Sequence, residues 1–300
     1  MTTVIETKRT ITLHMLSTAL SPITHMGGTR GNEAILNRER VIYNGEVVEV
    51  PFLSGNALRH RMIREPGATY LVDAYRLRKQ LTIDQANYMF NGGVLSASSN
   101  TDNMPLIAEM QRTLPLFRLL GGSLRSQIIS GSLNVSRGVL VCQENLETIA
   151  RSCPALADLE KTHAKAALEF VGSTQYTRGD VRKAKDAEQL LAPSAQLLQD
   201  EKSNLMIYNG ECVMPGAMFY HNVLLRNVSD VEIGAVLHAL AIWQRHGGSI
   251  GGSSRIGHGR LESVLWCDEP LDATELAVQY IQHVEAHEQD AVAWLGEAFQ

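Results

Sequence analysis

The chain has few cysteines, and none of them form a pair at metal-ligand spacing. Cys142, Cys153, Cys212 and Cys267 are scattered, without a CxxC motif or an accompanying histidine spacing. This pattern indicates neither a zinc ribbon nor a disulfide framework, so we expect reduced thiols in a cytoplasmic protein. The chain also lacks an uninterrupted apolar run of about 18 residues, and its first residues carry no apolar signal segment, so we expect no membrane insertion and no secretion.

Several motifs of nucleotide and hydrolase chemistry are missing as well. No GxxxxGK[ST] sequence is present, and the glycine-rich segment at 247–260 follows an expected helix and precedes an expected strand, the reverse of a dinucleotide-binding loop. A GxSxG sequence at a strand-to-helix turn is not found either. His283 and His287 lie one helical turn apart, but the glutamate between them is misplaced for a zincin and the helix is acidic. We therefore expect a solvated helix face there, and neither a metal nor a cofactor.

Positive charge is absent from the end of the chain. After Arg260 the sequence has no Lys or Arg, whereas nine Asp and Glu residues follow. The formal net charge of −5 thus conceals a positive excess before that point, because residues 1–261 carry all 27 basic groups and 23 of the 32 acidic ones. Such a distribution does not exclude binding of a polyanion by a local patch.

Glycine is concentrated in the segment GGSIGGSSRIGHGR at 247–260, where six of fourteen positions are glycine. The segment offers bare backbone N–H groups, serine hydroxyls and fixed cations, notably from Ser254, Arg255 and His258. This combination suits phosphate groups.

The first third of the chain reads as a strand at 9–20, a loop containing Gly27, Gly28 and Gly31, and a hairpin that turns at Asn44-Gly45. Ser54 is positioned to cap the helix ALRHRMIRE, which we expect to end at Pro66-Gly67. The start of this helix offers polar and cationic groups to a ligand in front of it. These groups belong to Ser54, Asn56, Arg59, His60 and Arg64.

The rest of the chain alternates helices and strands. We expect a helical insertion at 67–124, interrupted at Pro115, then strands near 127–142 and helices at 146–172. A second hairpin is expected at 205–228, followed by a helix capped at Ser229 or Asp230, a strand at LESVLW and a final helix at 273–299. Two βαβ-like halves in this order predict an α+β, ferredoxin-like (RRM-like) core with insertions.

A basic segment at 173–188 has two readings, which the sequence leaves open. It is either a solvated loop or an arm that reaches nucleic acid, with cations on phosphates and the aromatic ring stacking on a base. Its relevant residues are Tyr176, Arg178, Arg182 and Lys183.

Catalysis is a second open question. His25 and His258 both lie in glycine-rich loops and could act as acid and base on an RNA 2′-hydroxyl, with Glu33 as a nearby carboxylate. Loop histidines more often serve only as hydrogen-bonding groups, which is the competing reading.

Three segments together resemble a known family. The early loop SPITHMGG, the segment PFLSGNALRHRMIRE and the late loop GGSSRIGHGRL are similar, in order and separation, to the RAMP superfamily of CRISPR effector backbone subunits. The amino-acid sequence of the early part, THMGGTRGNEAILNRERV, is most similar to the crRNA-binding backbone subunit of type IV CRISPR complexes. The resemblance covers the core and matches residues 67–124 weakly.

The resemblance implies a palm, a helical finger-like insertion and a thumb-like arm. On this basis we expect the palm at 1–66, 125–172 and 189–300, the finger at 67–124 and the thumb at 173–188. It also implies RNA contacts from Gly27, Gly28 and the Ser54 helix, completed by the late glycine loop. Where type III relatives carry a cleaving aspartate, this chain has Asn32 or, on a shifted alignment, Glu33. An amide cannot act as a general base, so the resemblance implies a binding subunit without nuclease activity.

The sequence therefore predicts a non-catalytic subunit that polymerises along a CRISPR RNA (crRNA) and presents it to a target DNA or RNA. Expected partners are further copies of the chain and other CRISPR effector subunits. The acidic C-terminal helix would be either a contact with the next copy or a solvated surface. Two alternatives stay open: a metal-independent endoribonuclease of the same superfamily, and a generic RNA-binding module.

Overall fold

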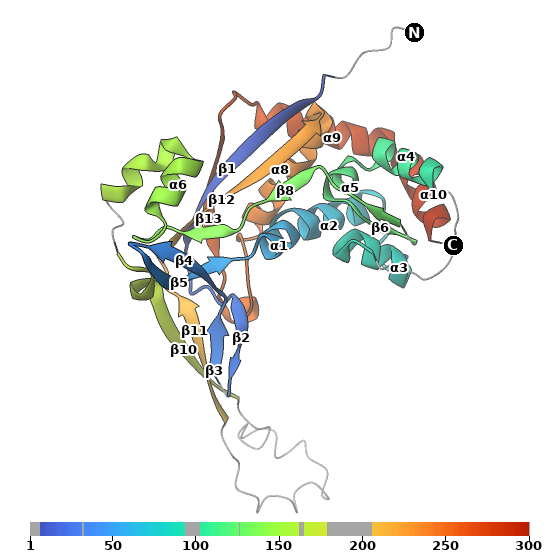
Figure 1. The fold of residues 1–300 in the computed structure, drawn as a ribbon. Coiled ribbons are helices and arrows are strands. Elements are labelled where there is room, and N and C mark those ends of the chain that lie inside the picture. Colours follow the sequence, from blue (N-terminus) through green and yellow to red (C-terminus); the bar gives the residue numbers. More distant parts are fainter. Residues whose placement is uncertain are drawn as a thin grey trace, which may run out of the picture.

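The computed structural model describes residues 7–31, 33–93, 103–125, 127–161, 165–178 and 206–299. The fold is α+β, with a larger antiparallel sheet, a smaller sheet projecting below it and helices packed beside them (Figure 1). The alternation seen in the sequence explains the first strand, β1, because Ile11, Leu13 and Met15 are buried on one face.

The larger sheet has seven strands. Six of them follow the order β13 (Leu261–Cys267), β1 (Arg9–Ala19), β12 (Met218–Val228), β9 (Gly138–Leu140), β5 (Glu46–Leu53) and β4 (Arg38–Tyr43), and β8 (Leu133–Val135) also pairs with β12. The β4–β5 hairpin turns at Asn44 and Gly45, whose φ angles of 51° and 82° match the expected Asn-Gly turn.

One face of this sheet is covered by helices α8 (Asp230–Arg245) and α9 (Ala273–Ala286). Ser229 caps α8 as expected and forms a reciprocal capping box with Glu232. The expected single helix at 273–299 is wrong, because the chain bends at His287 and continues as α10 (Glu288–Ala298).

The helix after Ser54 is longer than expected. It runs through α1 (Gly55–Leu58), a π-helical turn (Arg59–Arg64) and α2 (Glu65–Ala74). Pro66 occupies the first turn of α2, directly after the π-helical turn, where its missing N–H and its ring are tolerated. Pro66 therefore does not end the helix.

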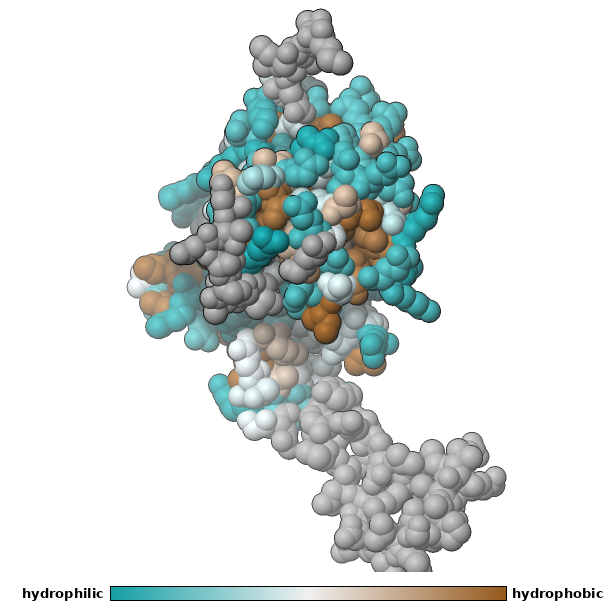
Figure 2. All heavy atoms as spheres, turned by 90° about the vertical axis from the view of Figure 1, so that its right-hand side faces the viewer, coloured by the Kyte–Doolittle hydropathy of each residue, from teal (hydrophilic) through white to brown (hydrophobic). Residues whose placement is uncertain are grey.

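The described residues 67–93 and 103–124 are mostly helical and pack into the same hydrophobic core as α8. The break at Pro115 separates α4 (Met104–Thr113) from α5 (Pro115–Leu120). Tyr88, Leu116 and Phe117 are fully buried in the common core. The remaining elements of this region are α3 (Ile83–Ala86), the π-helical turn η2 (Asn87–Asn91), β6 (Gly122–Leu124) and, just beyond it, β7 (Gln127–Ile129). The outer face of these helices is mostly hydrophilic, with separate hydrophobic patches (Figure 2).

The smaller sheet has four strands in the order β10 (Val171–Arg178), β11 (Met206–Val213), β3 (Glu33–Leu36) and β2 (Met26–Arg30). The first glycine loop is thus largely a hairpin, β2–β3. The second hairpin expected at 205–228 is wrong, because β11 joins the smaller sheet whereas β12 joins the larger one. The turn at Pro215-Gly216 marks a change of sheet and does not close a hairpin.

The second face of the larger sheet is partly covered by α6 (Leu146–Ser152) and the 3-10 helix η3 (Pro154–Lys161), which form a small cluster with Tyr220. Two further 3-10 helices are η4 (Ala167–Phe170) and η7 (Ser254–Ile256). Throughout the part of the chain that the structure describes, every helix is too short or too polar to cross a lipid bilayer.

Candidate RNA-binding surface

The late glycine loop is bound directly to the first loop. Gly252 N–H donates to the Thr24 carbonyl at 2.8 Å, and the Thr24 hydroxyl returns a 2.8 Å bond to the Gly252 carbonyl. A side chain at Gly251 would place its Cβ 2.6 Å from the Thr24 carbonyl oxygen, so this approach requires glycine. The two segments that were nominated separately from the sequence therefore form one unit.

His25 joins the same unit to the helix start. Its Nε2 accepts the Ser54 N–H at 3.1 Å, and the Ser54 hydroxyl accepts the Ala57 N–H as an N-cap. Partial burial lowers the pKa of His25, which favours the neutral ring that this acceptor role needs. All three segments of the family resemblance are thus linked by hydrogen bonds.

In front of the Ser54 helix lies an open cavity of about 650 Å³. Ser54, Gly55, Asn56 and Arg59 line one side, and residues of the 130–137 segment line the other. The two sides meet closely, because a Cβ at Gly55 would lie 2.7 Å from the Val135 carbonyl oxygen. We expected the late glycine loop to be the opposite wall, but the lining of this cavity is instead completed by residues 130–137.

The groups of that second wall were not predicted from the sequence. Ser130, Asn134 and Arg137 are exposed and line the cavity. Arg137 forms a 2.6 Å ion pair with Glu39 and keeps half of its side chain exposed. The short stretch SGSLNVSRG is rich in small polar residues and contains an arginine, which was the available signal.

The two arginines nominated on the helix are directed inward. Arg64 is 5% exposed and donates to the carbonyls of Tyr88, Met89 and Gly121, so it is not available to a nucleic acid in this structure. Burial, with Arg59 nearby, lowers the pKa of Arg64 to about 10. Arg59 donates to the Leu120 carbonyl, and burial lowers its pKa too, although it still lines the cavity.

The other nominated residues differ in accessibility. Gly27, Gly28 and Asn56 are exposed, and His60 is half-buried. In the late loop Ser254 and Arg255 are exposed, whereas His258 is partly buried and its Nδ1 has no hydrogen-bond partner among the described residues.

The nominated arm is only partly described. The backbones of Tyr176 and Arg178 lie in β10, where Tyr176 is opposite Tyr208 of β11. Arg182 and Lys183 lie outside the described residues. β11, which pairs with β10, was assigned from the sequence to another hairpin.

The three nominated catalytic groups, His25, His258 and Glu33, all lie among the described residues. The lone pair of His25 Nε2 is used by the Ser54 N–H, and Glu33 is an exposed residue at the start of β3. Asn32 lies outside the described residues.

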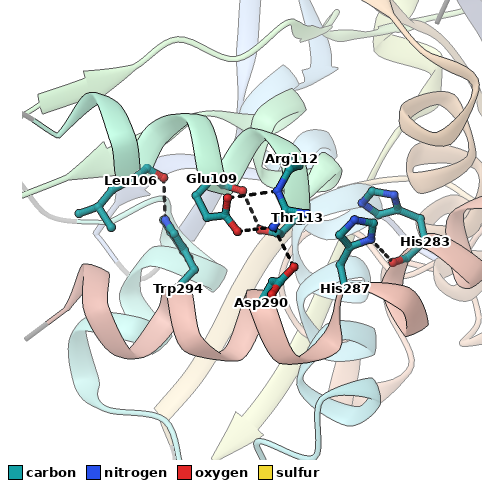
Figure 3. Close-up of polar contacts among 8 residues, drawn as sticks. All are labelled: Leu106, Glu109, Arg112, Thr113, His283, His287, Asp290 and Trp294. Carbon is teal, nitrogen blue, oxygen red and sulfur yellow. Dashed lines mark hydrogen bonds and ion pairs between the residues drawn. The ribbon is translucent and has the colours of Figure 1, made fainter. Parts of the chain in front are cut away.

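The His283–His287 pair is half-buried and not on a solvated face as expected. The two rings stack with centroids 4.1 Å apart (Figure 3). They line a cavity of about 340 Å³ together with Arg112 and Arg118. Arg112 in turn bridges Glu109 and Asp290, at 2.5 and 2.8 Å. Within the described ranges no three His, Cys, Asp or Glu side chains converge as metal ligands would.

No family model matches the chain, and no curated protein matches it by sequence. Among solved structures, a chain of a "Type IV-B CRISPR Complex" matches with 14% identity and a TM-score of 0.59, covering 88% of this chain and 96% of that one. The Csc2 crystal structure from Thermofilum pendens matches at 15% identity over 98% of this chain and 79% of that one, but its TM-score of 0.39 is too low to carry an argument. The chain therefore shares its fold with a chain of a type IV-B CRISPR complex.

Proposed function

We propose that the chain is a non-catalytic, crRNA-binding backbone subunit of a CRISPR effector complex. The observation that carries the proposal is the hydrogen-bonded union of the late glycine loop, the first loop and the Ser54 helix beside a polar cavity. We refer to residues 24–28, 54–59, 130–137 and 252–258 as the RNA-binding surface.

This surface offers the donors that a phosphate backbone needs. Bare N–H groups, the amides of Asn56 and Asn134 and the guanidinium groups of Arg137 and Arg255 all contact phosphates without reading sequence. Affinity would come mainly from counterion release, so binding falls steeply with salt and depends little on guide sequence. Guide bases held outward then pair with the target strand.

The proposed architecture has a ferredoxin-like palm, a finger-like region and a thumb. The strand order β13-β1-β12-β9, with α8 between β12 and β13, supports the palm. The helices at 67–124 would be the finger. The β10–β11 hairpin supports the thumb, whose basic residues Arg178, Arg182 and Lys183 would extend the RNA path.

The absence of catalysis in the proposal rests on the occupied Nε2 of His25 and on an asparagine where relatives carry an aspartate. Several copies would polymerise along one guide and associate with other effector subunits. The target, whether DNA or RNA, would be read by guide pairing alone.

The test uses Arg137→Ala combined with Arg255→Ala, two exposed cations at separate parts of the surface. We expect affinity for a fluorescein-labelled single-stranded RNA to fall at least about tenfold, with a shallower salt dependence, because phosphate contacts are lost. The matched control is Arg151→Ala on α6, an arginine with 78% of its side chain exposed and outside the surface. An equal loss of RNA affinity in both variants would mean that only the overall charge matters, and would contradict the proposed surface.

The assembled particle separates the proposal from its alternatives. Native mass spectrometry of the chain co-expressed with a crRNA should give a defined multimer, whereas a generic RNA-binding module would give variable occupancy. Incubation of that particle with labelled complementary RNA should leave the strand intact. Regularly spaced cuts would overturn the non-catalytic assignment and favour the endoribonuclease.

A further inference from the structure

The outer edge of β13 is incompletely paired. β13 ends the larger sheet, and its inner side pairs with β1. On the outer side Leu261 N–H donates to the Gly248 carbonyl, and Gln244 accepts the Ser263 N–H and donates to the Leu261 carbonyl. By the alternation of a strand, Leu265 and Cys267 present their backbone groups on this side too. No described residue hydrogen-bonds to them there.

Beside this open edge lies an apolar cavity of about 420 Å³, bounded by α8, α9 and β13. None of its lining residues is charged, and Leu237, Leu240, Leu265, Ala277 and Val278 contribute most of its aliphatic side chains. Leu265 and Val278 remain 37% and 44% exposed at its mouth. We call this cavity, together with the open edge, the β13 groove.

The other face of β13 is apolar as well. Val264 is 64% exposed, and Trp266 is half-buried with its Nε1 lacking a hydrogen-bond partner among the described residues. Proteins usually protect a sheet edge with charges, proline or a covering element. Between residues 263 and 267 β13 carries neither charge nor proline, whereas the opposite edge strand, β4, carries Arg38, Glu39 and Arg40.

The rim of the β13 groove is acidic. Glu262 lies at one end of the strand, and Asp268, Glu269 and Glu275 lie at the other. Glu269 has an ion-pair partner in Arg9 at 3.8 Å, Asp268 lies 3.4 Å from His14, and the exposed Arg260 precedes the strand. The four carboxylates still outnumber the two arginines, and the chain from 261 onward contains no Lys or Arg. Two copies joined through this edge would bring like charges together, so the rim disfavours a second copy and favours a basic partner.

We propose that the β13 groove binds an extended apolar segment of another protein, flanked by Lys or Arg. The backbone of this segment pairs with Leu265 and Cys267 by strand addition. Its alternate side chains enter the cavity or cover Val264 and Trp266, and its flanking cations meet Glu262 at one end and the Asp268 cluster at the other. The proposal does not depend on RNA binding.

The probe is a dye-labelled synthetic peptide of about seven alternating Val and Thr residues, the length of a strand, with two Lys at each end. Fluorescence anisotropy with the full chain should give at least about tenfold tighter binding than either of two reference peptides. One has Glu in place of the flanking Lys, and the other carries N-methylated backbone amides that cannot pair. Equal affinity for the three peptides would overturn the proposal.

Two variants locate the site. Val264→Lys places a charge on the edge strand, and Val278→Lys places one at the cavity mouth on α9. Each should weaken the Lys-flanked peptide about tenfold, whereas Ile42→Lys on the opposite edge strand should not. Ile42 is 80% exposed and provides the matched control.

Analytical ultracentrifugation of the unliganded chain tests the competing occupant. The proposal expects the same sedimentation for the unmodified chain and for Val264→Lys. A concentration-dependent dimer that Val264→Lys abolishes would assign the edge to a second copy and overturn the proposal. Unchanged circular dichroism and melting temperature would verify that each variant folds.

Discussion

The RNA-binding surface and the β13 groove are opposite in chemistry although both involve β13 or the loop before it. The first offers backbone N–H groups, amides and exposed arginines, and its segments are joined by backbone hydrogen bonds. The second is an uncharged apolar cavity with an acidic rim. The formal net charge of −5 is a sum over the whole chain, so it gives the local charge of neither region. A polyanion and a basic protein segment can thus be bound by one chain without competing for the same groups.

The largest effect is expected from acidification, which should destabilise the whole fold and therefore weaken binding at both regions together. His221 on β12 is fully buried, and burial lowers its pKa to about 4. The unfolded chain binds a proton near pH 6.5 and the folded chain does not, so stability falls as the pH drops from about 6.5 to 4, by about 3 kcal/mol. Urea unfolding across this range measures the effect, and His221→Leu should flatten that part of the profile. If RNA binding and peptide binding were lost at different pH values, the losses would have separate local causes and would not result from unfolding of the whole chain.

Salt should separate the two regions more cleanly. If RNA engages about four phosphates, its affinity falls roughly fiftyfold between 50 and 200 mM salt. Peptide binding at the β13 groove, which rests on apolar contact and strand pairing with only a few screened charges, should change by less than about threefold. Parallel titrations by fluorescence anisotropy provide the measurement. A similar salt slope for both ligands would remove the distinction.

Gly55→Ala should give the smallest effect, restricted to the RNA-binding surface. Its Cβ would meet the Val135 carbonyl oxygen at 2.7 Å, so the helix start must move away from residues 130–137. We expect a loss of about 1–3 kcal/mol in the free energy of unfolding and weaker RNA binding, with peptide binding retained. Gly296→Ala on α10 is the control, because a Cβ there meets no atom within 4 Å and Gly296 lies outside the RNA-binding surface. Equal RNA affinity in both variants would mean that the cavity does not contribute.

The sequence predicted correctly those helices and strands that are determined by residues close to them in the chain. The Ser229 capping box defines the start of α8, Asn44-Gly45 gives the hairpin, and the alternation in 9–20 gives β1. Three of the four segments of the proposed RNA-binding surface were also nominated from their glycines, serines and basic residues, whereas residues 130–137 were not.

The failures concern residues whose role depends on distant partners. Nothing near Arg64 in the sequence announces that the carbonyls of Tyr88 and Gly121 will enclose its guanidinium. The pairing of β11 with β3 is likewise a long-range choice, so the turn at 215–216 resembled a hairpin. The π-helical turn before Pro66 is set by packing, since helical propensity alone favours a stop at proline.

Gln244 restricts the register in which another strand can pair with the β13 edge. Its side-chain amide already occupies the outward backbone positions of Leu261 and Ser263, as a short piece of neighbouring strand would. An incoming segment can therefore pair only beyond the Ser263 N–H, with the Ser263 carbonyl and then with Leu265. Because a shift of one residue turns every side chain of a strand to the opposite face, the occupied groups limit the registers that a partner strand can take and thus the side chains that can enter the cavity.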